Sequence, residues 1–390
     1  MKKRLLPGLA FLILMQMALA NLHAIPAFAR KYRMSCKTCH APFPKLKAYG
    51  DEFAQNGFVI KDKDAPRYVV DTGDDFLSLI RELPIALRLE GFWTYNNSNK
   101  GQIDFTSPYL LKILSGGEIT KNISYYFYFF FSERGEVAGI EDAFVMFNNL
   151  FGTELDFYVG QFQVSDPLFK REIRLTFEDY MVYKASPGSS QADLTYDRGI
   201  IAAYGLPSGT DLVVEVVNGS GLNPANPFRN YDEDKYKNIL LRVSQDVAEP
   251  LRVGGFYYFG KEEQVSEINS MWLAGADATV SSRNLELNLQ YVERRDRNPY
   301  FLNSASDDIK TRGAFAEIIY SPRGDDSKWY GVGLWNWVTS DQKELEYGSL
   351  TMHLGFLLRR NFRLTSEFSY IYESAYAKHA RLAVGLITAF

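Results

Sequence analysis

From about residue 85 to its last residue, the chain alternates large apolar side chains with small or polar ones. In 350–356 the even positions are large and apolar, and in 284–291 the odd positions are apolar. Near the end, Leu382, Val384 and Leu386 share the register of the terminal Phe390. A period of two is that of a β-strand with one apolar face, so the pattern predicts strands over this whole stretch.

The alternating segments can be counted as strands. They lie near 85–95, 106–115, 122–131, 138–148, 154–163, 197–206, 208–217, 237–246, 251–259, 271–281, 284–293, 312–321, 328–339, 349–358, 362–373 and 379–390. An even number of this size is typical of single-chain outer-membrane barrels, and Tyr and Phe, which dominate the 15% aromatic content, suit their interfacial girdles. We predict an all-β transmembrane barrel of about 16 antiparallel strands over 85–390, surrounded by outer-membrane lipid.

The lengths of the connections give the barrel an orientation. Short connections, predicted to be periplasmic, are 149–152, 206–209 and 359–361. Long connections, predicted to face outside, lie near 164–196, 218–236 and 294–311. An even strand number places both termini in the periplasm of a Gram-negative bacterium. A soluble sandwich or propeller is the alternative, but the aromatic run 125–131 suits a membrane interface better.

The first 24 residues are typical of a secretion signal. Three basic residues follow Met1, and an apolar stretch runs from Leu5 to Leu19. Small residues offer cleavage after Ala20 or after Ala24. The apolar stretch is too short for a good transmembrane helix, so we expect export and removal of residues 1–24.

Cys36-Lys37-Thr38-Cys39-His40 follows this signal and contains both cysteines of the chain. Cys-x-x-Cys-His is the attachment pattern of a c-type haem. The two thiols bind the porphyrin covalently, and His40 is placed to ligate the iron on the proximal side. A redox-active cysteine pair and half of a zinc site are the alternatives, but neither the βαβ context nor two further ligands at suitable spacing is visible.

The second axial position of the iron has no obvious ligand. Met34 is close in sequence, and His353 lies on a predicted strand with its side chain toward the lumen. His379 also points inward. His23 remains in the mature chain only if the signal is cut after Ala20, and Met352 is expected to face lipid. Met34 and His353 are the leading candidates, and an open or otherwise ligated site is the alternative.

Residues 25–84 form the predicted haem segment. They are too few for a self-sufficient cytochrome core, so we expect them to dock into or against the barrel and possibly plug it. Phe43, Leu46, Gly50 and Phe53 recur at helical spacing after Pro44, which predicts a short helix that Gly57 ends.

Charged residues near the motif and in the predicted outer loops suggest two further roles. Arg30, Lys31, Arg33 and Lys37 could neutralise haem propionates, or simply keep a linker soluble. Acidic residues at 232–234 and 307–308 could concentrate divalent cations outside, although outer loops are often acidic without function. The net charge of −4 and the membrane context argue against nucleic-acid binding.

A family resemblance covers about 35 residues around the motif. It rests on 26–30, 34–36, Cys39-His40, Phe43-Pro44, Leu46, Gly50, Phe53 and Gly57. This stretch resembles the fused monohaem cytochrome c–porin family of bacterial outer membranes, whose best-known members oxidise iron. The resemblance implies one covalent haem c on a barrel of about 16 strands, electron uptake from extracellular Fe(II), and delivery to a soluble periplasmic cytochrome or another periplasmic carrier.

Three functions follow as expectations. The first is transfer of electrons inward from an extracellular donor, most readily Fe(II). The second is a porin or transport channel with a haem-bearing plug, and the third is electron export to extracellular metal. We assign no catalytic residue, because the sequence carries no hydrolase or transferase signature.

Overall fold

The structure is a computed structural model. It describes residues 27–60, 69–70, 73, 77, 79–80, 83–98, 101–303, 308–375 and 377–390. The predicted signal peptide, with His23, lies outside the described residues. Among the helices in this described part of the chain, none is long and apolar enough to cross a bilayer.

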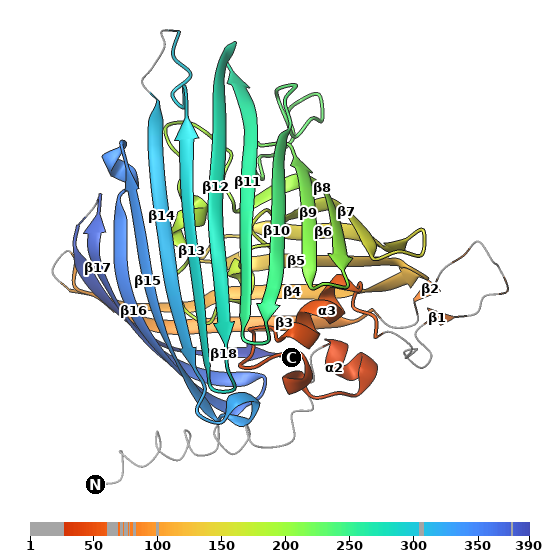
Figure 1. Cartoon of the computed structure of the whole chain (residues 1–390). Coiled ribbons are helices and arrows are strands. Elements are labelled where there is room, and N and C mark those ends of the chain that lie inside the picture. The colour runs from red at the N-terminus through yellow and green to blue at the C-terminus, as the bar shows by residue number, and fades with distance from the viewer. Residues whose placement is uncertain are drawn as a thin grey trace.

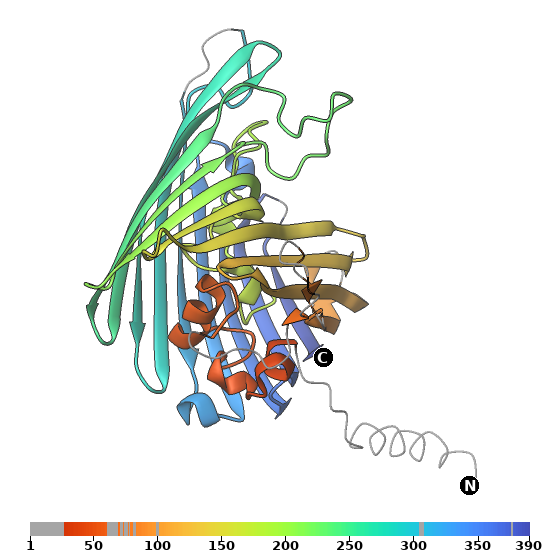
Figure 2. The ribbon, with the colours of Figure 1, turned by 90° about the vertical axis from the view of Figure 1, so that its right-hand side faces the viewer.

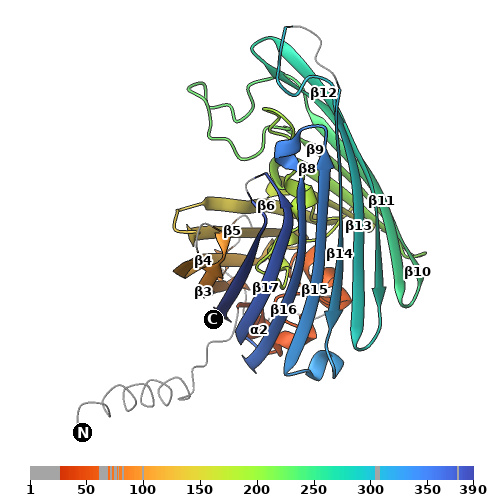
Figure 3. The same ribbon diagram turned by 90° about the vertical axis from the view of Figure 1, so that its left-hand side faces the viewer.

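Sixteen antiparallel strands close into a barrel, as the alternation predicted (Figures 1 and 3). They are β3 (Ile85–Asn96), β4 (Gln102–Thr120), β5 (Ile123–Glu133), β6 (Gly139–Leu150), β7 (Leu155–Gln163), β8 (Tyr196–Leu206), β9 (Thr210–Val217), β10 (Asn238–Ala248), β11 (Leu251–Gln264), β12 (Glu267–Ser281), β13 (Leu285–Asp296), β14 (Ile309–Tyr320), β15 (Trp329–Ser340), β16 (Tyr347–Arg359), β17 (Phe362–Ser374) and β18 (His379–Ala389). Each strand pairs with its neighbours in sequence, and β18 pairs with β3 to close the ladder.

Strand β16 shows how the alternation divides the two faces of the barrel. Leu350, Met352 and Leu354 are 54%, 75% and 52% exposed on the outside. Thr351 and His353 are buried inside. The predicted directions of Met352 and His353 are therefore confirmed, and the outer face presents the apolar surface that a barrel needs in lipid.

The connection between β7 and β8 departs from the expected topology. We predicted that the 164–196 connection faces outside, but residues 164–195, here called the inner loop, fold into the barrel and contact its far wall. Tyr180 stacks on Phe315 of β14 with ring centroids 4.3 Å apart. The inner loop carries the 3₁₀ helices η3 (Arg171–Ile173) and η4 (Met181–Lys184), and its side chains pack in the lumen against β14 and β15.

Residues 27–60, here called the mouth segment, lie at the end of the barrel that carries the short turns (Figures 1 and 2). The segment contains α2 (Ala27–Tyr32), the 3₁₀ helix η1 (Cys36–Thr38) and α3 (Ala48–Gln55). The predicted helix begins later than expected, because a turn at 41–47 closes on the motif through Lys47 N donating to Cys39 O at 2.8 Å. Beyond the mouth segment, β1 (Val69–Val70) pairs with β2 (Leu79–Ile80) in a separate two-stranded sheet.

Gly57 ends α3 as predicted, and its surroundings explain why the residue is glycine. Its φ is +68°, a conformation that residues with a Cβ rarely adopt. A Cβ at Gly57 would also overlap the Ser124 hydroxyl on β5. This close approach brings the end of α3 directly onto the barrel wall.

A prediction about barrel packing concerns the fully buried ring of Tyr330 on β15. A Cβ at Gly355 on β16 would overlap this ring, whereas a Cβ at Gly331 would have no neighbour closer than 3.8 Å. Gly355→Ala should therefore lower the free energy of unfolding by about 1–3 kcal/mol through overpacking, and Gly331→Ala should change it little. Urea unfolding in detergent, followed by the heat-dependent gel shift of the barrel, measures both; equal stability of the two variants would contradict this packing.

Candidate haem-attachment site and lumen

Apolar contacts hold the mouth segment on the barrel. Phe58 stacks on Phe28 at 4.8 Å and on Tyr126 of β5 at 5.0 Å between ring centroids. Phe53 and Tyr32 complete a buried cluster that also contains Met146 of β6. Such aromatic pairs bury large areas and add about 0.5–1.5 kcal/mol each beyond that burial.

Ion pairs add a second set of attachments on the opposite wall. Lys45 lies 2.5 Å from Glu286 at the start of β13. Lys37 lies 3.1 Å from Asp326, and Lys47 pairs with Asp325, both in the turn between β14 and β15. The exposed pairs contribute little energy, but together with the aromatic cluster they fix the segment across the whole mouth.

The motif itself forms a tight turn. Cys39 N and His40 N both donate to Cys36 O, at 3.2 and 2.9 Å, and the Ser35 hydroxyl caps η1. Both thiols are free and half-buried, and burial raises the pKa of each. A Cβ at Gly50 would overlap the Cys39 carbonyl, so only glycine lets α3 pack this closely against the motif.

The surroundings of His40 suit a proximal iron ligand. Its Nδ1 lies 2.7 Å from Pro44 O, and burial lowers the pKa of the imidazole. A neutral ring that donates from Nδ1 to a backbone carbonyl keeps the lone pair of Nε2 available, which is the usual arrangement of a metal-bound histidine. Two free thiols with this histidine fit a covalent haem c, and no group of three or more His, Cys, Asp or Glu that could hold a metal ion occurs within the described ranges.

The candidate distal ligands lie in different places. Met34 packs against the aromatic cluster that Cys39 also contacts. His353 lies in the lumen with Nδ1 2.9 Å from Glu367 and Nε2 3.5 Å from the Tyr330 hydroxyl, so binding iron would require it to leave these partners. His379 is partly exposed, with Nδ1 2.9 Å from Ala377 O. The identity of the distal ligand stays a prediction.

Several of the other charged residues singled out from sequence have protein partners. Arg30 donates to Ile85 O, and Lys37 is paired with Asp326. In the outer loops, Asp232 pairs with Lys237 and Asp308 with Arg295. These pairs neutralise two of the acidic residues expected to attract cations.

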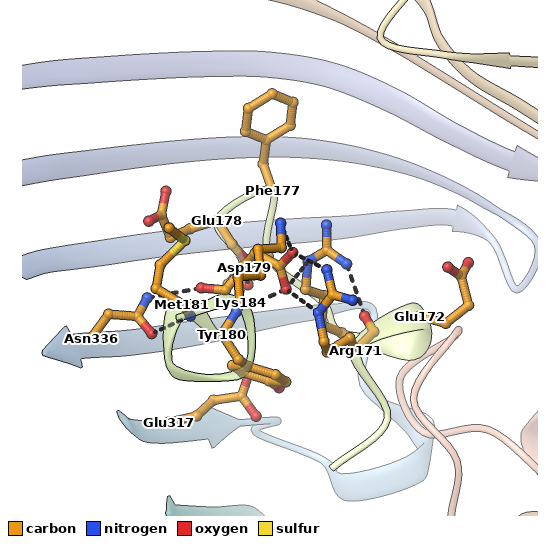
Figure 4. A network of polar contacts seen from close by, with 12 residues as sticks. Arg171, Glu172, Phe177, Glu178, Asp179, Tyr180, Met181, Lys184, Glu317 and Asn336 are labelled. Atoms are coloured by element: carbon orange, nitrogen blue, oxygen red, sulfur yellow. Dashed lines mark hydrogen bonds and ion pairs between the residues drawn. The ribbon is translucent and has the colours of Figure 1, made fainter. Parts of the chain in front are cut away.

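Buried charges hold the inner loop in the lumen (Figure 4). Asp179 accepts two hydrogen bonds from Arg171, at 3.1 and 2.6 Å, and lies 2.5 Å from Lys184 and 3.8 Å from Arg174. Although burial opposes ionisation, these cations hold the pKa of Asp179 well below its usual range. Asp179 is therefore ionised and balances the positive charges of the inner loop that surround it.

Carboxylates and hydroxyls also attach the inner loop to the barrel wall. Glu367 of β17 accepts hydrogen bonds from Phe177 N at 2.6 Å and Glu178 N at 2.8 Å. Glu178 in turn pairs with Arg381 of β18 at 2.6 Å. Tyr180 donates to Glu317 of β14 at 3.0 Å.

One line of contacts joins the mouth segment to the inner loop. Arg363 of β17 donates to Phe43 O at 2.9 Å and to the Tyr330 hydroxyl. Tyr330 faces His353, and His353 faces Glu367, which holds the inner loop. Sequence reasoning placed His353 toward the lumen but did not find its partners or this line of contacts, because alternation gives direction and not partners.

The aromatic attachment predicts how the mouth segment can be released. Phe58→Ala removes both stacking contacts and should cost about 3–5 kcal/mol of docking free energy, enough to speed proteolysis within 27–60 about 100-fold or more. Phe228→Ala, at a position 85% exposed in the 218–236 connection, is the control. Unchanged protease resistance of Phe58→Ala would contradict the docking described above.

The Asp179 network predicts how the lumen responds to charge removal and to pH. Asp179→Asn leaves three cations without their carboxylate and should destabilise the inner loop by about 3–5 kcal/mol, which raises single-channel conductance. Because the folded pKa is depressed, the stabilising charge is present above the ordinary value of 3.8 and is lost only as pH falls through the lower folded value. The Asp179 charge should thus persist from pH 7 to pH 5, and the excess conductance of Asp179→Asn over the parent should be the same at both pH values.

The control for this prediction is Asp193→Asn, because Asp193 lies in the same loop and hydrogen-bonds Thr195 rather than a cation. Its conductance should match that of the parent. A low conductance in Asp179→Asn would show that the network does not hold the loop.

Comparison with known proteins identifies the fold. No protein-family model and no curated protein matches the chain. Among solved structures, an anion-selective porin from Comamonas acidovorans is 13% identical with a TM-score of 0.59, covering 79% of this chain and 99% of its own. The outer membrane channel DcaP of Acinetobacter baumannii is 11% identical with a TM-score of 0.58, covering 79% and 97%. Salmonella typhi OmpF, in complex with daunomycin, is 10% identical with a TM-score of 0.55 over the same shares. The chain therefore has the fold of outer-membrane porins.

Proposed function

We propose that this chain is an outer-membrane protein that carries one covalent haem c at the mouth of a porin-type barrel and transfers electrons between the cell exterior and the periplasm. The observation that carries this proposal is the pair of free thiols beside His40, whose Nδ1 already faces a backbone carbonyl. A haem held there would supply the one-electron chemistry of its iron. The mouth segment lies at the short-turn end, which is the periplasmic end in porin-type barrels.

The electron donor in this proposal is extracellular Fe(II), and the acceptor is a soluble periplasmic cytochrome. Each Fe(II) oxidised to Fe(III) outside would reduce one oxidised cytochrome inside. The choice of Fe(II) rests on the family resemblance of the motif region. Electron export to extracellular metal would use the same residues in the opposite direction.

A solute channel with a haem-bearing plug is the second candidate. The structural likeness to porins and channels supports it more directly than it supports electron transfer. The inner loop and mouth segment narrow the barrel, and apolar packing holds both of them in place. If the protein is a channel, the haem segment would act as a plug of the pore, either as a purely structural element or in response to the redox state of the haem.

Covalent haem attachment is the first test of the main proposal. Co-expression with cytochrome c maturation factors should give a haem-stained band at the size of the chain on a denaturing gel. Cys36→Ala/Cys39→Ala should lose this band completely while keeping the heat-dependent shift of a folded barrel, because the thiols lie outside the barrel ladder. A parent protein without covalent haem, beside a control cytochrome that matures, would leave only the channel candidate.

Anaerobic addition of Fe(II) to the oxidised protein then separates the functions. Growth of the reduced c-haem α-band in proportion to Fe(II) supports iron oxidation. A spectrum that dithionite reduces and Fe(II) does not would contradict it, and a haem potential well below that of the Fe(III)/Fe(II) couple would favour export. High, steady conductance in planar bilayers would favour the solute channel.

A further inference from the structure

A narrow cavity lies inside the barrel between the inner loop and the wall formed by β3, β17 and β18. Its lining includes the guanidinium groups of Arg88, Arg174 and Arg363. The cavity, together with the open space at its mouth, has a volume of about 520 Å³. Its walls are so close that the centre of a water-sized group has only about 40 Å³ in which to move. It can therefore accept a few heavy atoms, such as a carboxylate, and has no room for a large ring.

Arg363 is the least compensated charge in this cavity. Its side chain is 1% exposed, and no carboxylate of the described residues lies within 4.0 Å of it. Its Nη1 donates to two neutral oxygens, those of Phe43 and Tyr330, while Nε is buried without a partner. A buried cation without a counter-charge is costly, so this site favours an anion.

Two further guanidinium groups reinforce this preference. Nε of Arg88 and Nε of Arg174 are also buried without hydrogen-bond partners. Arg88 pairs with Glu90 and lies 3.5 Å from Glu172, which Lys112 also binds. Glu133 lines the cavity as well.

Carboxylates compensate much of the charge of Arg174: although burial opposes it, Asp179, Glu172 and Glu90 raise the pKa of this guanidinium, so only its unpartnered Nε adds to the preference for an anion. Arg174 shares Asp179 with Arg171 and Lys184, which bind that carboxylate more closely. Arg363 differs from Arg174 in having no direct ion pair with any described residue, although Glu90 attracts it from a longer distance.

Arg363 connects this cavity to the region of the proposed haem ligand. Arg363 binds the carbonyl of Phe43, whose ring centroid is 5.0 Å from that of His40. Arg88 of β3 lines the same cavity as Arg363 of β17.

We propose that Arg363 and Arg88 bind a propionate carboxylate of a haem attached at Cys36 and Cys39. This inference rests on the proposed function. It replaces the sequence-based expectation for Lys37, which pairs with Asp326 instead. Charge-assisted hydrogen bonds from guanidinium to carboxylate match both the donor geometry and the size of the cavity.

Arg363→Gln in the haem-loaded full-length protein tests the inference. Loss of this cation should lower the midpoint potential, because a nearby positive charge disfavours the oxidised haem. The propionate bending band in the resonance Raman spectrum should shift as well. Arg363→Lys should restore part of both signals, since it keeps the charge and loses the planar fork.

Arg312→Gln is the matched control, because it makes the same change of charge at an exposed arginine of β14 that pairs with Glu293 and does not line the cavity. Its potential and propionate band should match those of the parent. If Arg363→Gln does not fold, Arg88→Gln carries the same test. Unchanged potential and propionate band in the arginine variant would overturn the inference while leaving the proposed function intact.

A free anion is the other possible occupant of the same site. In that case the potential of the parent would change with added phosphate at constant ionic strength, and Arg363→Gln would abolish this dependence. That result would overturn propionate binding. Absence of covalent haem in the parent, read from the haem-stained gel, would instead be a failure of the proposed function.

Discussion

Closure of the β-ladder is the constraint on which the rest of this structure depends. The last strand pairs with the first from Arg88–Ala389 to Asn96–Arg381, and Leu87 and Phe390 exchange both backbone hydrogen bonds beyond that register. A closed ladder leaves no strand edge unpaired, which is what lets strands cross a bilayer. Once it closes, every side chain of a strand must face either lipid or lumen.

Closure also creates the interior that the inner loop occupies. A barrel of sixteen strands is too wide for its own side chains to fill. The inner loop supplies the missing volume through apolar contacts such as Tyr180 on Phe315. It supplies the charge balance through Asp179, whose cations come from the loop itself. Barrel wall and loop are therefore one packed unit, although they are distant in sequence.

The sequence predicted the strands and failed where contacts between distant segments decide the structure. Each predicted strand has its counterpart, because a period of two is set locally and recurs along each strand. The inner loop was predicted outside because its connection is long, and length gives no sign that residues such as Asp179 and Lys184 pair within the barrel. Their mutual pairing is visible only after folding. Likewise Cys36 and His40 form a local motif, whereas Arg363 is 320 residues from Phe43 and carries no local signal.

The place where the mouth segment docks has a consequence for the order of assembly. Phe58 rests on β5 and β6, Lys45 and Lys47 reach β13 and the turn after β14, and Phe43 meets β17. No half of the barrel offers this surface alone. The segment can reach its final position only after early and late strands have come together, so any enzyme that modifies its half-buried thiols has easiest access before insertion is complete.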